Sequence, residues 1–341
     1  MSGRARLDVS RRPTLLYMAL ARLFAQPESG PLILLVLELA IFQFLQPQFL
    51  SPLNISNALA FTVELGLIAL AMTLLMTAGE FDLSVGSVFG FSAVLMWTLF
   101  NSGVTSLLIG FIIALVVAAL IGLFNGWFVT RFRISSFLVT LGMLLVVRGA
   151  ALYLTNGFPQ RTWSAAGSPL AAVLVGAVHI GQFHTYMSLF WFIVAAAVFH
   201  YVLTRTRTGN WILATGGNRL AAQARGVNVR STKTALFMLT AVMSGLSGII
   251  SSIRTSAANP NSGTGYELEV IAMVVIGGTA LTGGRGTIIG TVLGILILRL
   301  MRNGLVMIGV PGLAYEIFIG AIILVMVALH SWLERGRQME T

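Results

Sequence analysis

The side chains that most often carry out chemistry are scarce in this chain of 341 residues. It has no cysteine, which excludes disulfides, thiol catalysis and cysteine metal sites. His179 and His184 lie in a loop-like stretch, while His200 and His330 lie at the ends of apolar segments, where snorkelling toward an interface accounts for them. The sequence therefore predicts no resident metal and no catalytic group of residues.

A nucleotide site of the phosphate-loop type is also absent from the sequence. The pattern G-x-x-x-x-G-K-[ST] needs a lysine directly after a glycine. The only lysine, Lys233, follows Thr232. We therefore expect no cofactor on this chain and no ATP hydrolysis by it.

The elements that must position the remaining polar residues are mostly apolar. Hydrophobic residues make up 57% of the chain and charged residues only 9%, whereas soluble domains carry roughly 25% charged residues. The 36 glycines suit close helix packing in a membrane. We predict an all-α polytopic membrane protein with about ten transmembrane helices, since each needs about 20 apolar residues. The expected spans run near 31–46, 58–78, 83–100, 104–128, 134–154, 185–203, 234–253, 267–282, 287–303 and 311–329.

The positions of the basic residues predict the orientation of these spans. The net charge of +10 would suit nucleic acid, but most of the 21 basic residues fall on one side of the membrane if the N-terminus is placed inside. This bias follows the positive-inside rule. We expect a multi-pass membrane protein with both termini cytoplasmic, and no nucleic-acid partner.

The spans divide the chain into three parts. Residues 1–30 form a cytoplasmic segment that we interpret as an amphipathic helix at the membrane surface, because its apolar run is short and broken by Arg22. An export signal is the alternative that we reject. Residues 31–330 form the transmembrane domain, and residues 331–341 a cytoplasmic tail.

Residues 204–233 form a polar, basic loop on the expected cytoplasmic side. Asn218 is placed to cap a short helix that runs from Arg219 to Arg225. An ordinary solvated loop is the alternative interpretation. The other interior turns on this side are short, and unusually long loops in compact proteins tend to be functional.

The spacing of small residues in this loop resembles the coupling loop of a known family, the permeases of bacterial ATP-binding cassette (ABC) importers for ribose, arabinose, xylose, galactose and related solutes. Further stretches agree, so that the resemblance covers roughly residues 55–330. The residues that match in the loop are Thr208, Gly209, Ala214, Gly216, Gly217, Asn218, Ala221, Ala222, Gly226 and Val227. Outside it the matches are residues 79–86, Asn125–Gly126, residues 140–142, Arg148–Gly149, residues 267–269, 271–272, 277–279 and 283–286, Gly290–Thr291 and Asn303–Gly304. Glu80 adds a carboxylate that many relatives lack, and its local role stays open.

The resemblance implies a non-catalytic permease subunit, located in the bacterial inner membrane, that imports a monosaccharide or related polyol. It implies two partner ATPase subunits that use ATP and magnesium, a periplasmic sugar-binding protein, and a second permease chain, identical or paralogous. In that family the coupling loop docks as a short helix in a cleft of the ATPase. A nucleoside or another small polar solute is an alternative substrate, and an ion-coupled secondary transporter is an alternative function that leaves the loop unused.

Polar residues inside the expected spans are candidates for the translocation path, because a charge there costs about 2.5–3.5 kcal/mol and needs a reason. Glu64 lies against the translocation path or at a contact between helices. Alternatively, its helix starts later and leaves Glu64 near the periplasmic surface. Arg148 pairs with Asp82 or Glu64, or lines a polar cavity, and we favour the pair. Glu267 suits a helix N-terminus, with a gate or docking role as the alternative. The candidates together are Glu64, Asp82, Asn125, Thr140, Arg148 and Glu267.

Overall fold

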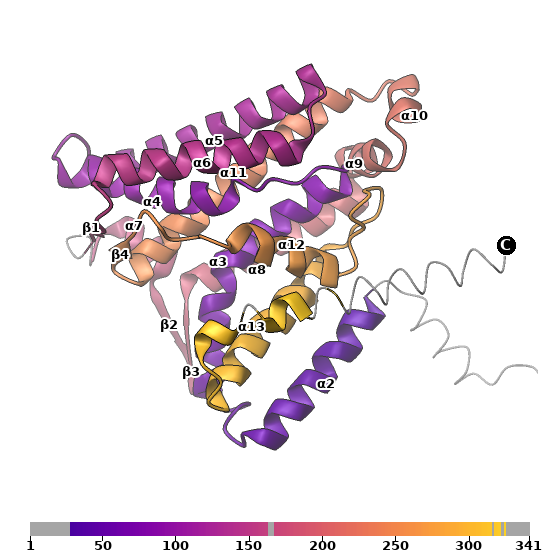
Figure 1. Ribbon diagram of the computed structural model, residues 1–341. Helices are drawn as coiled ribbons and strands as arrows, with labels where there is room; N and C mark the ends of the chain where they lie inside the picture. Colours follow the sequence, from indigo (N-terminus) through magenta and orange to yellow (C-terminus); the bar gives the residue numbers. More distant parts are fainter. Residues whose placement is uncertain (1–27, 163–166, 316, 322–323, 325–341) are drawn as a thin grey trace, which may run out of the picture.

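The computed structural model describes residues 28–162, 167–315, 317–321 and 324. A bundle of long helices dominates this part of the chain, with two small sheets (Figure 1). The predicted N-terminal amphipathic helix lies almost wholly outside the described residues, and the predicted tail lies outside them. The helices are α2 (Ser29–Leu45), α3 (Pro52–Thr77), α4 (Val85–Asn101), α5 (Leu107–Phe132), α6 (Ser136–Thr155), α7 (Pro169–Val175), α8 (Met187–Arg205), α9 (Arg207–Gly217), α10 (Arg219–Ala224), α11 (Val229–Arg254), α12 (Tyr266–Ile276), α13 (Ile288–Met307) and the 3-10 turn η2 (Gly312–Ala314).

The two sheets are antiparallel and two-stranded. Strand β1 (Gln160–Arg161) pairs with β4 (Ala257–Ala258). Strand β2 (Ala177–Ile180) pairs with β3 (Phe183–Tyr186) as a hairpin. In Figure 1 the β1–β4 pair lies at the opposite end of the bundle from α9 and α10. We call these the strand end and the α9–α10 end.

Helix starts follow the local sequence. Ser51 precedes Pro52, and its hydroxyl accepts a hydrogen bond from the amide of Asn54 at 3.4 Å. Ser106 and Thr287 cap α5 and α13 in the same way. Each cap satisfies an amide that the helix leaves without an intrahelical partner.

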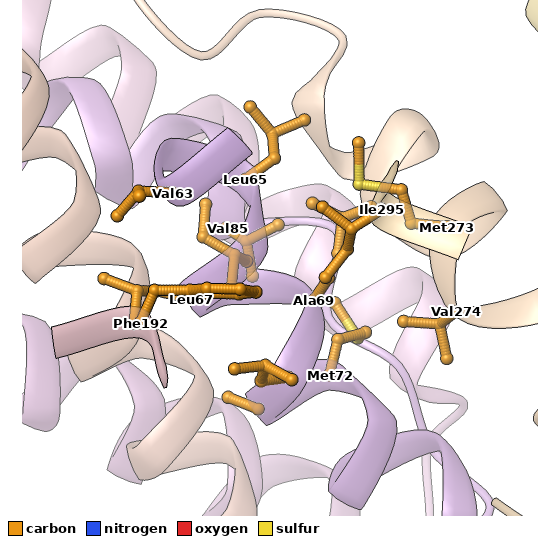
Figure 2. Close-up of a cluster of buried hydrophobic side chains, with 14 of the residues drawn as sticks. Val63, Leu65, Leu67, Ala69, Met72, Val85, Phe192, Met273, Val274 and Ile295 are labelled. Atoms are coloured by element: carbon orange, nitrogen blue, oxygen red, sulfur yellow. The ribbon is translucent and has the colours of Figure 1, made fainter. Parts of the chain in front are cut away.

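Helix α3 forms the core of the bundle. Residues 62–77 are buried without interruption, so all faces of this stretch contact other helices. Figure 2 shows Leu65 and Leu67 of α3 among Phe192 of α8, Met273 of α12 and Ile295 of α13. A helix that is apolar all round is expected at such a position.

Six described helices are long and apolar enough to cross a membrane: α3, α5, α6, α8, α11 and α13. In α5, α6 and α8 less than a third of the most apolar window is buried, at 28%, 17% and 22%. Their outer faces therefore suit contact with lipid.

Eight of the ten expected spans coincide with described helices, of which six are long and apolar enough to cross a membrane. The span predicted over 267–282 is helical only in α12, which has 11 residues. At 1.5 Å per residue this helix is about 16 Å long, against a hydrocarbon core of about 30 Å. The span predicted over 311–329 lies partly outside the described residues.

Helices α4 and α12 both begin inside the bundle. The carbonyl of Val85, the first residue of α4, accepts a hydrogen bond from Ser244 near the middle of α11. The rings of Phe89 in α4 and Tyr266 in α12 meet edge to face, with centroids 5.1 Å apart. From this meeting point α4 runs to the strand end, where Asn101 donates to the carbonyl of Arg161 in β1, and α12 runs to the opposite end.

Glycine allows α5 and α11 to pack backbone to backbone. A Cβ on Gly122 would lie 2.5 Å from the carbonyl oxygen of Phe237 and 2.6 Å from Cα of Met238. Small residues at such contacts are the usual basis of close helix packing in membranes.

We expect Gly122→Ala to destabilise the chain by about 1–3 kcal/mol, because the added methyl forces α5 and α11 apart. The matched control is Gly142→Ala in α6, where a Cβ meets nothing within 4 Å; there the higher helix propensity of alanine, about 1 kcal/mol, leaves stability equal or higher. Thermal unfolding of the two detergent-solubilised variants measures the difference. Equal melting temperatures would contradict the packing seen between α5 and α11.

Candidate functional site

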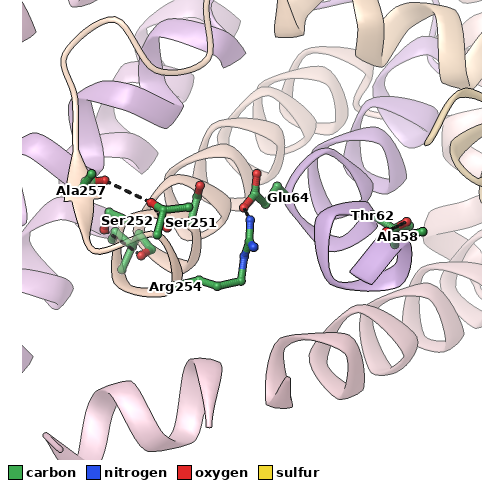
Figure 3. A network of polar contacts seen from close by, with 9 residues as sticks. Ala58, Thr62, Glu64, Ser251, Ser252, Arg254 and Ala257 are labelled. Carbon is green, nitrogen blue, oxygen red and sulfur yellow. Dashed lines mark hydrogen bonds and ion pairs between the residues drawn. The ribbon is translucent and has the colours of Figure 1, made fainter. Parts of the chain in front are cut away.

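Glu64 forms a buried ion pair at the core. Its carboxylate accepts a hydrogen bond from Arg254, the last residue of α11, and each side chain is only 7% exposed. The Arg254 guanidinium also lies over the ring of Phe61, 4.3 Å from the centroid. Figure 3 shows this pair between α3 and α11. Helix α3 begins at Pro52, so the interpretation with a later start is wrong and Glu64 is part of a helix contact inside the bundle.

The connection between α3 and α4 is held by a second polar group. The carboxylate of Asp82 accepts hydrogen bonds from the amide and the hydroxyl of Ser84, at 2.8 and 2.6 Å. The Asn125 amide of α5 donates to the same hydroxyl at 3.0 Å, and the Thr140 hydroxyl of α6 accepts from the Leu83 amide at 3.0 Å. Three predicted candidates therefore meet here, fully buried, and they position the start of α4.

Arg148 contacts backbone rather than a carboxylate. Its guanidinium donates to the carbonyls of Pro260 and Ser262, at 2.7 and 2.9 Å. Gly90 of α4 leaves room for these acceptors, because a Cβ there would lie 2.6 Å from the carbonyl oxygen of Ser262. The expected pairing of Arg148 with Asp82 or Glu64 is wrong, since Arg148 instead satisfies carbonyls of the non-helical chain between β4 and α12.

Glu267 lies in the first turn of α12, where the helix dipole favours a carboxylate. One carboxylate oxygen accepts from the Gly265 amide at 3.3 Å. The other is buried and has no hydrogen-bond partner among the described residues. It faces Gly86 of α4, where a Cβ would collide with it. Glu267 and Arg148 therefore lie along the same side of α4, one turn apart.

A buried cluster links α12 to α13 and to the chain after it. Glu269 lies 3.5 Å from Arg299, and its carboxylate accepts from the Tyr315 hydroxyl at 2.9 Å. Sequence reasoning did not name Arg299 or Tyr315 as site residues. The available signal was an arginine and a glutamate of opposite charge inside neighbouring predicted spans.

Glu80 has a structural partner. Its carboxylate lies 2.6 Å from the ammonium group of Lys233, the only lysine of the chain, with side chains 15% and 9% exposed. The pair joins the α3–α4 connection to the first turn of α11. The extra carboxylate noted in the sequence therefore neutralises the one buried lysine.

Residues 204–233 contain two short helices rather than an irregular loop. The side chain of Asn218 accepts from the amide of Ala221 at 3.0 Å and caps α10, which confirms the predicted cap. Gly209 and Ala222 are buried within the chain, so Ala222 is not part of the outer surface that a partner would meet. The predicted loop residues that are exposed are Thr208, Ala214, Gly217, Asn218, Ala221 and Gly226.

Glycines join α9 to two distant turns of the chain. A Cβ on Gly283 would lie 2.8 Å from Cα of Gly79 and 3.1 Å from Cα of Gly216. The Gly284 amide donates to the carbonyl of Thr77 at 2.9 Å. The ends of α3 and α9 and the α12–α13 turn therefore meet backbone to backbone, in what we call the glycine joint (Gly79, Gly216, Gly217, Gly283, Gly284).

Residues 54–327 match a protein family described as the permease component of the branched-chain amino acid transport system. The match spans most of the chain. The chain belongs to this permease family. A permease of this kind, with six described helices that are apolar and long enough to span, is an integral membrane protein.

Several curated relatives are similar to this permease over most of their length. The ribose import permease protein of Escherichia coli (strain K12) is 36% identical over 304 residues, covering 89% of this chain and 92% of the relative. The galactose/methyl galactoside import permease protein of the same organism is 34% identical, covering 89% and 94%. The L-arabinose ABC transporter permease protein of Azospirillum brasilense is 32% identical, covering 91% and 89%.

We expect Glu80→Gln and Lys233→Met each to destabilise the permease by about 3 kcal/mol, because each leaves the other charge buried without a partner. The double variant is expected to recover most of the loss, since it leaves no unpaired charge. Thermal unfolding in detergent gives the double-mutant cycle. Additive losses would show that the two groups do not interact.

Proposed function

We propose that this permease is the membrane-spanning subunit of a binding-protein-dependent ABC importer that moves a monosaccharide or related polyol from periplasm to cytoplasm. The observation that carries the proposal is near-full-length similarity to permeases named for ribose, galactose and L-arabinose. The chain is not an enzyme in this proposal. ATP and magnesium are bound by a separate ATPase, in accord with the lack of a phosphate-loop lysine.

In the proposed topology about ten segments cross the inner membrane and both termini are cytoplasmic. Helices α2 and α4 have 17 residues each and are apolar. Helix α4 completes its crossing with the non-helical residues 78–84, and α12 with residues 259–265. The α9–α10 end is cytoplasmic in this proposal, because the basic residues gather there.

The glycine joint supports a mechanism of coupling through α9 and α10. Helix α9 contacts the end of α3 and the α12–α13 turn with no side chains between, and α10 follows α9 after the single residue Asn218. Beyond those contacts the chain leads directly to α4 and α12, the two helices that begin inside the bundle. An ATPase that moved α10 would therefore move the supports of both inner helices together.

The alternatives to this proposal are a different solute or a different transport mechanism. The family description names branched-chain amino acid transport, and a nucleoside or another small polar solute would use the same architecture. We favour a sugar because the three relatives above, named for sugars, match near their full length. An ion-coupled secondary transporter would leave the exposed α9–α10 surface without a partner.

The proposed assembly has two permease chains, identical or paralogous, two ATPase subunits and a periplasmic binding protein. We expect the purified permease alone to hydrolyse no ATP, and ribose uptake into proteoliposomes to need the permease, the ATPase and the binding protein together. Native mass spectrometry of the active complex is expected to give two permeases. ATP turnover by a permease preparation free of any ATPase subunit would refute the proposal.

A second test concerns the exposed side of α10. We expect Ala221→Trp to uncouple or release the ATPase, because overpacking a well-packed contact typically costs about 1–3 kcal/mol. Arg219→Ala and Arg225→Ala are the controls and should keep most transport, since exposed ion pairs contribute about 0–1 kcal/mol. ATPase co-purification and solute uptake are compared at equal membrane expression. Normal binding and uptake by Ala221→Trp would exclude α10 as the coupling element.

A further inference from the structure

The non-helical chain between β4 and α12, residues 259–265, runs from the strand end of the bundle to its middle. Its carbonyls at Pro260 and Ser262 are bound by Arg148, which lies beyond the midpoint of α6. The carbonyl of Gly263 abuts Gly86 in the first turn of α4. That turn is itself opposite the middle of α11. The inner part of this segment, residues 262–265, therefore lies away from both ends of the helices around it.

Part of this segment is exposed in the single chain. Asn261, Thr264 and Gly265 are exposed, and Ser262 is half-buried. The hydroxyl of Thr264 donates to the carbonyl of Asn261 at 2.8 Å, while no described residue hydrogen-bonds the side-chain amide of Asn261. The local turns are held by backbone bonds and by the side chain of Asn259, which accepts from the amide of Asn261 at 2.9 Å.

Lipid is excluded as the surrounding of these groups. Irregular backbone at membrane depth occurs only where protein buries it or where it lines a water-filled cavity, because an unsatisfied polar group in hydrocarbon costs several kcal/mol. The side chain of Asn261 has no such partner within the described chain. Water must therefore reach it, or another chain must cover it.

We propose that residues 259–265 line the water-filled passage through which the neutral solute crosses the membrane, with Arg148 as the residue that positions them. The proposal rests on the proposed function and names the surface that the solute meets at mid-depth.

The chemistry of the segment suits a polyhydroxylated solute. Asn261, Ser262 and Thr264 offer an amide and two hydroxyls, which both donate and accept hydrogen bonds and carry no charge. Sugar hydroxyls have the same dual character. The segment carries no ionisable side chain. Few, neutral hydrogen bonds also suit passage, because a solute that must leave again requires weak binding.

Arg148 holds the segment in place without covering its exposed side chains. The guanidinium faces the carbonyls of Pro260 and Ser262 and so fixes the path of the segment. Gly86 and Gly90 let the segment lie directly on α4. With the backbone held from one side, the opposite side carries the exposed Asn261 and Thr264.

The absence of native cysteine makes the proposal directly testable. Asn261→Cys and Thr264→Cys are each assembled with the ATPase and binding protein and treated with a membrane-impermeant, cationic methanethiosulfonate. Nucleotide-free and vanadate-trapped complexes are both examined. The matched control is Leu120→Cys on the apolar outer face of α5, where the side chain is 55% exposed.

We expect both segment cysteines to react in at least one of the two states and Leu120→Cys to react in neither. Modification of Asn261→Cys or Thr264→Cys should then cause loss of most ribose uptake. Segment cysteines that stay as unreactive as Leu120→Cys in both states would overturn the proposal, as would modification that leaves uptake unchanged.

The same experiment separates this proposal from the proposed function. If the unmodified complex carries none of ribose, arabinose and galactose, the sugar assignment fails. Reaction of the segment cysteines in that complex would still support an aqueous passage at residues 259–265. Conversely, sugar uptake by a complex whose segment cysteines never react would uphold the importer and reject this passage.

Discussion

Inside a membrane, a chain must satisfy the polar groups of its own backbone. The structure depends on this constraint at the two points where helices break. At the first, Asp82 and Thr140 hold the non-helical chain that precedes α4. At the second, Arg148 binds two carbonyls of the chain that precedes α12. At both breaks, polar side chains thus bind backbone groups that lack helical partners. Transporters commonly form their solute sites at such discontinuous helices.

The two breaks are mechanically related through the glycine joint. Backbone contacts at Gly79, Gly216 and Gly283 leave no flexible side chains between α9 and the supports of α4 and α12. Helix α3 adds a rigid centre, because its buried stretch is packed on all sides. Closely packed interiors shift between discrete arrangements rather than deform gradually. A displacement of α9 would therefore be transmitted to α4 and α12, the helices that begin in the middle of the bundle.

The sequence predicted most long helices, since apolar length alone defines them, and it predicted the Asn218 cap from local spacing. It failed where partners are remote in the chain. Arg148 was expected to find a carboxylate, but its acceptors are carbonyls, which no residue type reveals. Glu80 and Lys233 are 153 positions apart. The break before α12 was visible only as the polar residues 259–265, because the apolar residues after it resemble a full span.

The Glu64–Arg254 pair has a consequence for how the chain is made. Glu64 enters the membrane early, whereas its partner lies 190 positions later; at about 5–20 residues per second, the ribosome takes roughly 10–40 s to supply it. During that interval a carboxylate that costs about 2.5–3.5 kcal/mol in a bilayer has no counter-charge. The nascent α3 must be sheltered by the insertion machinery or by water. Chains that stop before Arg254 therefore retain an unpaired acid inside α3.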